Sequence, residues 1–154
     1  MSKVKNPRQQ NEDRRADSRT RLIDAPAETV FDAFSDPEKL ARWWGPKGFS
    51  STFDEFDLRA GGYWRLTMHG PDGTDYPNEN RFLEVEDNSL VVVEHLADHH
   101  FILTISFTPK GQATLVGWRQ LFDTREHYEQ IAEFISTANE QNLDRLQAVA
   151  ERRS

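Results

Sequence analysis

The sequence contains no cysteine among its 154 residues, which excludes a disulfide framework and thiol chemistry and fits a reducing compartment. No apolar run approaches the ~20 residues that a membrane-spanning helix needs. The opening stretch MSKVKNPRQQ lacks the apolar core of a secretory signal. We therefore expect a cytoplasmic protein that has no membrane partner.

Basic side chains are also in deficit, with 19 Lys and Arg against 26 Asp and Glu, for a formal net charge of −7. An acidic surface opposes binding to nucleic acid or anionic lipid. The pairs Arg14-Arg15 and Arg152-Arg153 are too small for a nucleic-acid footprint. Neither G-x-G-x-x-G nor G-x-x-x-x-G-K-[ST] occurs, so we expect no nucleic-acid partner and no cofactor.

The spacing of apolar residues supplies the fold class. Period-two patterns predict a first strand at 19–24 and six strands between 50 and 122, among them strands at 63–69 and 113–122. Helical spacing predicts two short helices after Pro26 and Pro37, with Asp36 as the cap of the second. A long one-sided helix is expected over 124–150, with Asp123 as its cap and Glu126 completing a capping box. The prediction is an α+β domain: strand, two short helices, six strands and a long C-terminal helix.

Residues 1–17 carry almost no apolar side chains and are expected to form a flexible N-terminal arm, leaving 18–154 as one domain. The arm and the edge strands of an open sheet both offer association surfaces. We therefore expect a homodimer.

Four stretches resemble one bacterial family: IDAPAETVFDAFSDPEKLARWWGPKGF at 23–49, DLRAGGYWRLTMHGPDGT at 57–74, TISFTP at 104–109 and NLDRL at 142–146. They are similar to the homologues of the activator of the heat-shock-protein-90 ATPase, within the START-like, birch-pollen-allergen-like (SRPBCC) superfamily. The resemblance implies a helix-grip fold, in which a curved sheet wraps on the last helix. Relatives bind hydrophobic ligands, regulate a chaperone, or act as polyketide cyclases and aromatases.

The chain departs from this family pattern at two places. Asn78 and Asn80 stand where the family often has an aromatic residue and then a glycine, and Ala138-Asn139 stand where Gly-Trp is usual. Both changes fall where a cavity wall is expected. They indicate a cavity that is more polar than in relatives, or one of different shape.

The favoured function is that of a small-molecule binding protein rather than an enzyme, with a hydrophobic or aromatic ligand held between sheet and helix. The same residues can instead simply fill a core. The predicted lining residues share the concave face of the sheet or the inner face of the helix: Trp64, Tyr76, Asn78, Asn80, Phe82, Glu84, Phe107, Trp118, Ile131, Ile135 and Ala138.

Two alternatives remain open. Strict alternation from Tyr76 places Glu84 on the concave face, where a carboxylate can act as general acid or base in a cyclase- or hydrolase-like enzyme. Its structural alternative is a salt bridge to Arg65, Arg81 or Arg119. The other alternative is an interaction module that regulates a chaperone, although the chaperone-activating relatives usually carry an additional domain.

The tryptophan and histidine clusters can be explained by structural roles. Trp43 and Trp44 are expected to plug the gap between helices and sheet, or to place one indole at a ligand entrance. His95, His99 and His100, with Glu94 or Asp98, invite a metal reading. They lack a converging second group of ligands, so we expect no metal there.

Overall fold

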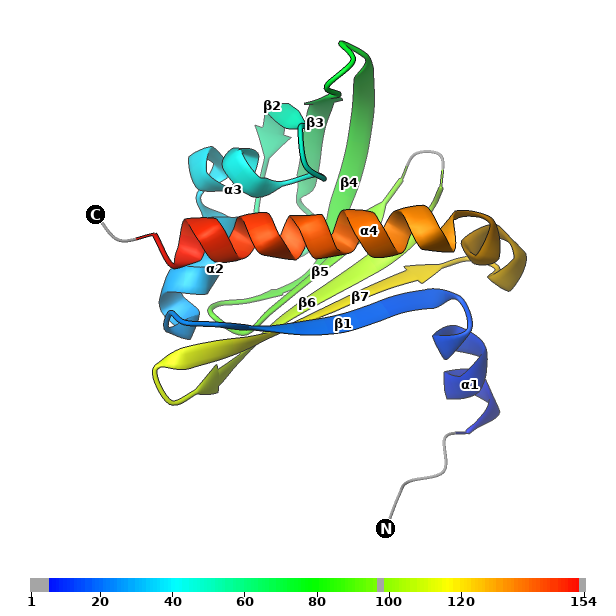
Figure 1. Ribbon diagram of the computed structural model, residues 1–154, viewed down its shortest axis with the longest axis horizontal. Coiled ribbons are helices and arrows are strands. Elements are labelled where there is room, and N and C mark those ends of the chain that lie inside the picture. Colours follow the sequence, from blue (N-terminus) through cyan, green and yellow to red (C-terminus); the bar gives the residue numbers. More distant parts are fainter. Residues whose placement is uncertain (1–5, 97–98, 153–154) are drawn as a thin grey trace.

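The long C-terminal helix crosses the inner face of one antiparallel sheet (Figure 1). The computed structural model describes residues 6–96 and 99–152. Seven strands run in the order β1-β7-β6-β5-β4-β3-β2, so the predicted α+β fold is confirmed. The elements are α1 (Pro7–Asp13), β1 (Ala16–Ile23), α2 (Ala27–Ser35), α3 (Pro37–Trp43), β2 (Ser50–Phe56), β3 (Tyr63–His69), β4 (Asp75–Glu86), β5 (Leu90–His95), β6 (Phe101–Lys110), β7 (Ala113–Phe122) and α4 (Arg125–Ala150).

The N-terminal stretch contributes more structure than its composition indicates. Residues 7–13 form α1, which a capping box between Asn6 and Gln9 starts. Strand β1 begins at Ala16, three residues before the predicted Arg19, because Ala16 and Asp17 already pair with the end of β7. Residues 1–5 of the expected arm lie outside the described residues.

Local signals set the helix boundaries. Asp36 caps α3 by accepting the amide of Glu38 at 3.0 Å, as predicted from the Asp-Pro pair. The predicted cap of α4 is wrong by one residue, since Thr124 accepts the amide of His127 at 3.1 Å. Asp123 is not the cap because its carboxylate instead binds Nδ1 of His100 at 2.7 Å.

The hydrophobic core lies between the inner face of the sheet, α2, α3 and the C-terminal part of α4. Aromatic rings dominate it: the ring of Phe34 lies within 6.5 Å of the rings of Trp43, Phe56, Trp64 and Phe82. Trp43 is fully buried and donates its indole N–H to the carbonyl of Ala33 at 2.8 Å. Trp43 therefore fills the gap between the short helices and the sheet, which is one of the two roles predicted for it. Within the described residues, no helix is long and apolar enough to cross a membrane.

Candidate functional site

The two halves of α4 differ in how they meet the sheet. In the second half, Leu143 and Leu146 have at most 1% of their surface exposed. In the first half, Ile131 and Ile135 are only half-buried and Phe134 is 65% exposed. An apolar side chain that faces the protein without being covered marks a surface able to bind another apolar group.

Helix geometry shows which way Phe134 faces. Phe134, Ala138, Gln141 and Arg145 are spaced four, three and four residues apart and so share one side of α4. That side meets the loop after α3, because Gln141 accepts the amide of Lys47 at 3.1 Å. Phe134 therefore lies on the side of α4 that meets the loop after α3.

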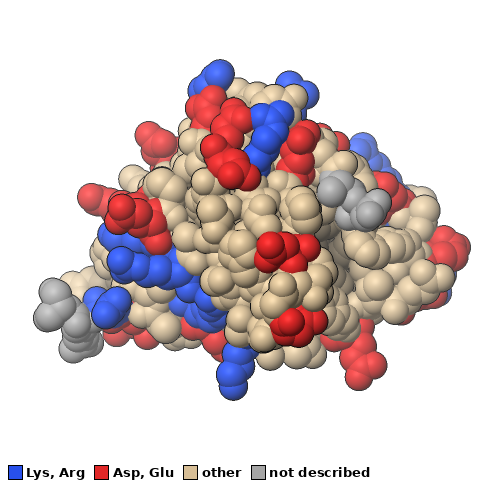
Figure 2. Space-filling view, turned by 90° about the horizontal axis from the view of Figure 1, so that it is seen from above, with Lys and Arg blue, Asp and Glu red and all other residues tan. Residues whose placement is uncertain are grey.

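Tyr76 lies on the inner face of β4, 44% exposed, and its ring packs 5.9 Å from the ring of Phe49. We call the partly exposed apolar surface that Ile131, Phe134 and Ile135 form on the first half of α4 the α4 mouth. When the molecule is viewed from above, broad uncharged areas lie between the groups of charged side chains (Figure 2).

The floor beside the α4 mouth is polar. Asn80 and His95 are paired across β4 and β5, and each is less than a tenth exposed. Asn80 donates its amide to the carbonyl of Trp64 at 3.3 Å, and its oxygen lies 2.9 Å from Nδ1 of His95. Because an amide oxygen can only accept, Nδ1 of His95 is the donor in this contact. The ring of Phe101 stacks on the imidazole at 4.7 Å, so both polar side chains are fixed in place.

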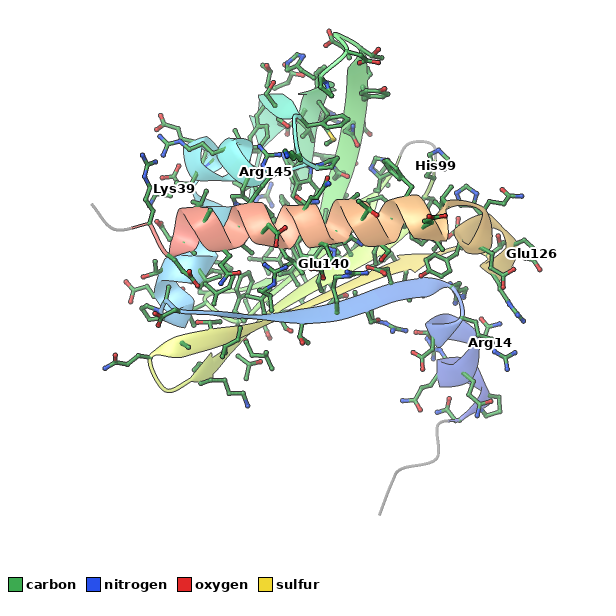
Figure 3. The ribbon with its side chains drawn as sticks, viewed as in Figure 1. Arg14, Lys39, His99, Glu126, Glu140 and Arg145 are labelled. Atoms are coloured by element: carbon green, nitrogen blue, oxygen red, sulfur yellow. The ribbon has the colours of Figure 1, made fainter. Side chains whose placement is uncertain are left out.

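Ion pairs close the β1 side of α4. Arg19 and Arg21 of β1 bind the two carboxylate oxygens of Glu140 at 2.7 and 2.9 Å, and the hydrogen bond from Arg19 lowers the pKa of Glu140. Beneath them, Asn139 donates to Asp17 and to Gln120, both at 2.9 Å. Figure 3 shows Glu140 on this side of the helix and Arg145 on the other.

Arg145 holds the loop after α3. Its guanidinium donates to four backbone carbonyls at 2.7–3.1 Å, those of Arg42, Gly45, Pro46 and Phe49. Burial lowers the pKa of Arg145. Asn142 adds a bond, accepting the amide of Gly45 at 2.9 Å. Gly45 has a φ of +100°, which favours glycine at this turn. The backbone on either side of Trp44 is thus pinned to α4.

Trp44 lies against the three other tryptophans. Its half-buried ring is 4.7 Å from the ring of Trp64, 5.7 Å from that of Trp43 and 6.1 Å from that of Trp118. Trp64 and Trp118 are buried, and their indole nitrogens have no hydrogen-bond partner among the described residues. The sequence predicted Trp44 as a plug or as part of a ligand entrance, and the structure packs it against the core, half-buried.

The predicted lining residues do not form one surface. Trp64, Asn80, Phe82, Trp118 and Ala138 are buried, and Asn78 is half-buried. Phe107 contacts Phe31 of α2, with ring centroids 5.4 Å apart, and belongs to the core. Pattern reasoning did not select Phe134 or Gln120, and it considered His95 only as a metal ligand. Alternation with Val91 and Val93 is the signal that places His95 inside.

The prediction that Glu84 faces the cavity is wrong. A β-bulge between Phe82 and Glu84 shifts the register against β5, so Glu84 pairs with Val92 and is exposed. Val85 returns to the inner side in its place. A bulge inserts one extra residue and reverses the alternation beyond it. The hypothesis of an enzyme that uses Glu84 as general acid or base is therefore not supported, because Glu84 does not face the inside of the sheet.

Two open hollows lie away from α4. One of about 540 Å³ surrounds Gly117 on the outer face of the sheet, and one of about 550 Å³ lies between α2 and the β4–β5 turn. Neither contains a predicted lining residue on the inner face of α4.

The histidines form two pairs of contacts rather than a metal centre. Nδ1 of His99 lies 2.9 Å from Nε2 of His127, and His100 lies between Glu94 and Asp123 at 2.7 Å from each. The hydrogen bonds to Glu94 and Asp123 raise the pKa of His100. No metal-binding group of three or more His, Cys, Asp or Glu occurs in the described part of the chain. The proposed ligand Asp98 lies outside the described residues.

Comparison with solved structures supports the fold. A protein of Arthrobacter aurescens matches with a TM-score of 0.85 at 22% identity, covering 94% of this chain and 90% of its own. A Nitrosomonas europaea protein gives 0.82 at 21% identity, with 90% and 96% covered. One from Chromobacterium violaceum gives 0.81 at 25% identity, with 90% and 99% covered.

A comparison with curated proteins gives no match. The family model described as activator of Hsp90 ATPase homolog 1-like protein matches residues 24–151. That stretch runs from the turn after β1 through the end of α4 and includes every element of the α4 mouth. The chain therefore belongs to the activator of Hsp90 ATPase homolog 1-like family.

Proposed function

We propose that the protein binds a small molecule of mixed polarity in the α4 mouth. The ligand's apolar part would contact Ile131, Phe134 and Ile135, and its polar part would reach toward the floor at Asn80 and His95. The fold is one that commonly binds ligands, which supports this class of function without indicating the ligand.

The observation that carries the proposal is the uncovered apolar side of the first half of α4. Phe134 is 65% exposed, and Ile131 and Ile135 are only half-buried. Each square ångström of apolar surface removed from water contributes about 25 cal/mol. A ligand that covers these side chains gains that free energy without disturbing the core under Leu143 and Leu146.

The recessed floor favours a small molecule over a protein partner. Asn80 is 5% exposed and His95 is 7% exposed, so a flat protein surface cannot reach their polar atoms. A molecule of a few rings can enter beside the helix. Its polar groups would find fixed partners, since both side chains are held by hydrogen bonds.

A ligand panel tests the proposal. Planar aromatics, fatty acids and sterols are added to the full chain while the melting temperature and the methyl NMR signals are followed. At least one class is expected to raise the melting temperature and to shift the Ile131 and Ile135 methyl signals. Ile131→Ser should weaken that binding about tenfold, the effect of losing ~1.4 kcal/mol of contact.

Leu22→Ser is the matched control, because Leu22 is a 56% exposed apolar side chain on β1. It is expected to leave the affinity unchanged. Two results would contradict the proposal: no class of ligand shifts the melting temperature or the methyl signals, or both variants weaken binding equally.

A further inference from the structure

Two buried hydrogen-bond donors in the core lack acceptors. The indole nitrogens of Trp64 and Trp118 have no partner, and the two residues are 0% and 3% exposed. Ser51 Oγ, on the edge strand β2, is the third such side-chain atom in the described residues. More than about 90% of buried polar groups in proteins are paired, so each exception calls for an explanation.

Trp43 provides a comparison within the same cluster. It is equally buried, and its indole N–H donates to the carbonyl of Ala33 at 2.8 Å. The fold therefore does satisfy an indole donor that serves only as core. Leaving a buried donor unpaired costs about 1–3 kcal/mol, so the structure bears this cost at two positions.

The two donors share one neighbour, the ring of Trp44, at 4.7 Å from Trp64 and 6.1 Å from Trp118. Trp44 is half-buried. Its backbone is held by Arg145 and Asn142 through bonds to main-chain atoms of adjacent residues. The Trp44 side chain can therefore rotate away without releasing the loop from α4.

The loop that carries Trp44 also contacts the side of α4 that bears the α4 mouth. Asn142, which binds Gly45, sits one helical turn from Ala138, and Ala138 is one turn from Phe134. The loop that carries Trp44 is thus held to the same side of α4 that continues, two turns earlier, into the surface proposed to bind the ligand.

We infer that the ligand is a planar aromatic molecule with a carbonyl oxygen, which displaces the Trp44 ring and accepts hydrogen bonds from Trp64 and Trp118. This inference rests on the proposed binding function. The acceptor is neutral, because burying a charge among these rings without a counter-ion is far more costly than burying a carbonyl. A flat ring system replaces the indole of Trp44 in its contacts with the two remaining indoles.

A matched pair of probes tests it. 9-Fluorenone and fluorene have nearly the same shape, and only fluorenone carries a carbonyl oxygen. By titration calorimetry on the full chain, fluorenone should bind about tenfold more tightly, the usual effect of one added hydrogen bond in a buried site. Trp64→Phe and Trp118→Phe should each reduce that preference, and Trp43→Phe should leave it unchanged.

Proton–nitrogen NMR of the unmodified chain gives a second measurement that needs no core substitution. Fluorenone should shift the indole N–H signals of Trp64 and Trp118 downfield. The indole N–H of Trp43 keeps its bond to Ala33, so its signal should show no downfield hydrogen-bond shift. Fluorene should not produce the downfield shift.

Equal binding of the two probes overturns the inference while the binding function stands. Tight binding of fluorenone with unmoved signals of Trp64 and Trp118 also overturns it. If neither probe binds while another ligand class does bind in the α4 mouth, the carbonyl-aromatic assignment is wrong. If no ligand of any class binds, the proposed function fails as well.

Discussion

The first and second halves of α4 continue one apolar stripe, yet only one half is buried. From Ala138 to Ala150 the stripe is covered by the sheet, α2 and α3. From Arg125 to Thr137 the described residues leave much of it in contact with water. A helical pattern thus identifies the side that faces the protein, but it does not tell whether the protein fills the space opposite.

The anchoring of the helix follows the same division. Arg19 and Arg21 bind Glu140 on one side, and Arg145 binds the loop after α3 on the other. The first half is held at its start by the Thr124 cap and by Tyr128, whose ring stacks on Phe122 at 5.7 Å. A ligand can therefore occupy space beside the first half while the second half keeps the fold together.

Truncation of the second half should have the largest effect. Leu143→Ala removes a side chain that is 0% exposed, and we expect a loss of about 2–5 kcal/mol in the free energy of unfolding. Ile135→Ala in the first half should lose about 1 kcal/mol, because its side chain already meets water. Urea denaturation measures both. Equal losses would show that the two halves are packed alike.

Arg145 is the next strongest test. Arg145→Met keeps most of the aliphatic stem but removes the donors to four backbone carbonyls, three of them in half-buried hydrogen bonds. We expect a loss of about 1–3 kcal/mol, the effect of leaving such groups unsatisfied. Arg125→Met in the first half is the control. Its pair with Glu129 at i,i+4 is exposed on both sides, so its loss should change the stability much less than the loss of Arg145.

A smaller effect is expected from pH at the start of α4. The hydrogen bond to Glu94, and to a smaller extent the one to Asp123, raises the pKa of His100 in the folded protein. The protonated form is thus favoured by folding, so its stabilisation is complete below the unfolded pKa near ~6.5. It is lost as pH rises through the higher folded value.

Because the His100 side chain is 34% exposed, solvent screening should limit this contribution to less than about 1 kcal/mol. His100→Gln should therefore lower the stability at pH 5.5 and have little effect at pH 9. The difference between the two proteins in urea midpoints at each pH measures it. A loss that is the same at both pH values would point to packing rather than charge.

Most of the fold was predictable because its signals are local. Strands β3 and β7 match the predicted ranges residue for residue, since glycine or proline turns bound alternating apolar residues there. The Asp36 cap was found for the same reason. The start of β1 was missed because Asp17 is buried by pairing and by Asn139, a contact 122 residues away in the chain.

The site was less predictable because it depends on register and on long-range contacts. Alternation holds along β4 from Tyr76 to Phe82, and the bulge then turns Glu84 outward. No residue type near Phe82 signals that bulge. The unpaired indoles of Trp64 and Trp118 are likewise invisible to pattern analysis, because pairing depends on the surroundings of one nitrogen atom. The sequence therefore predicts which face of the sheet a side chain lies on more reliably than it predicts what lies between the sheet and α4.

Phe134→Ser should produce the smallest change in stability and the clearest separation of the two halves. Because Phe134 is 65% exposed, its loss should alter the free energy of unfolding by less than about 0.5 kcal/mol. Leu22→Ser, at 56% exposure on β1, should be equally mild. Only Phe134→Ser is expected to weaken the binding of an apolar ligand, since Phe134, unlike Leu22, is part of the α4 mouth. If its stability falls as far as that of Leu143→Ala, the first half of α4 is packed in solution and has no open side to offer a ligand.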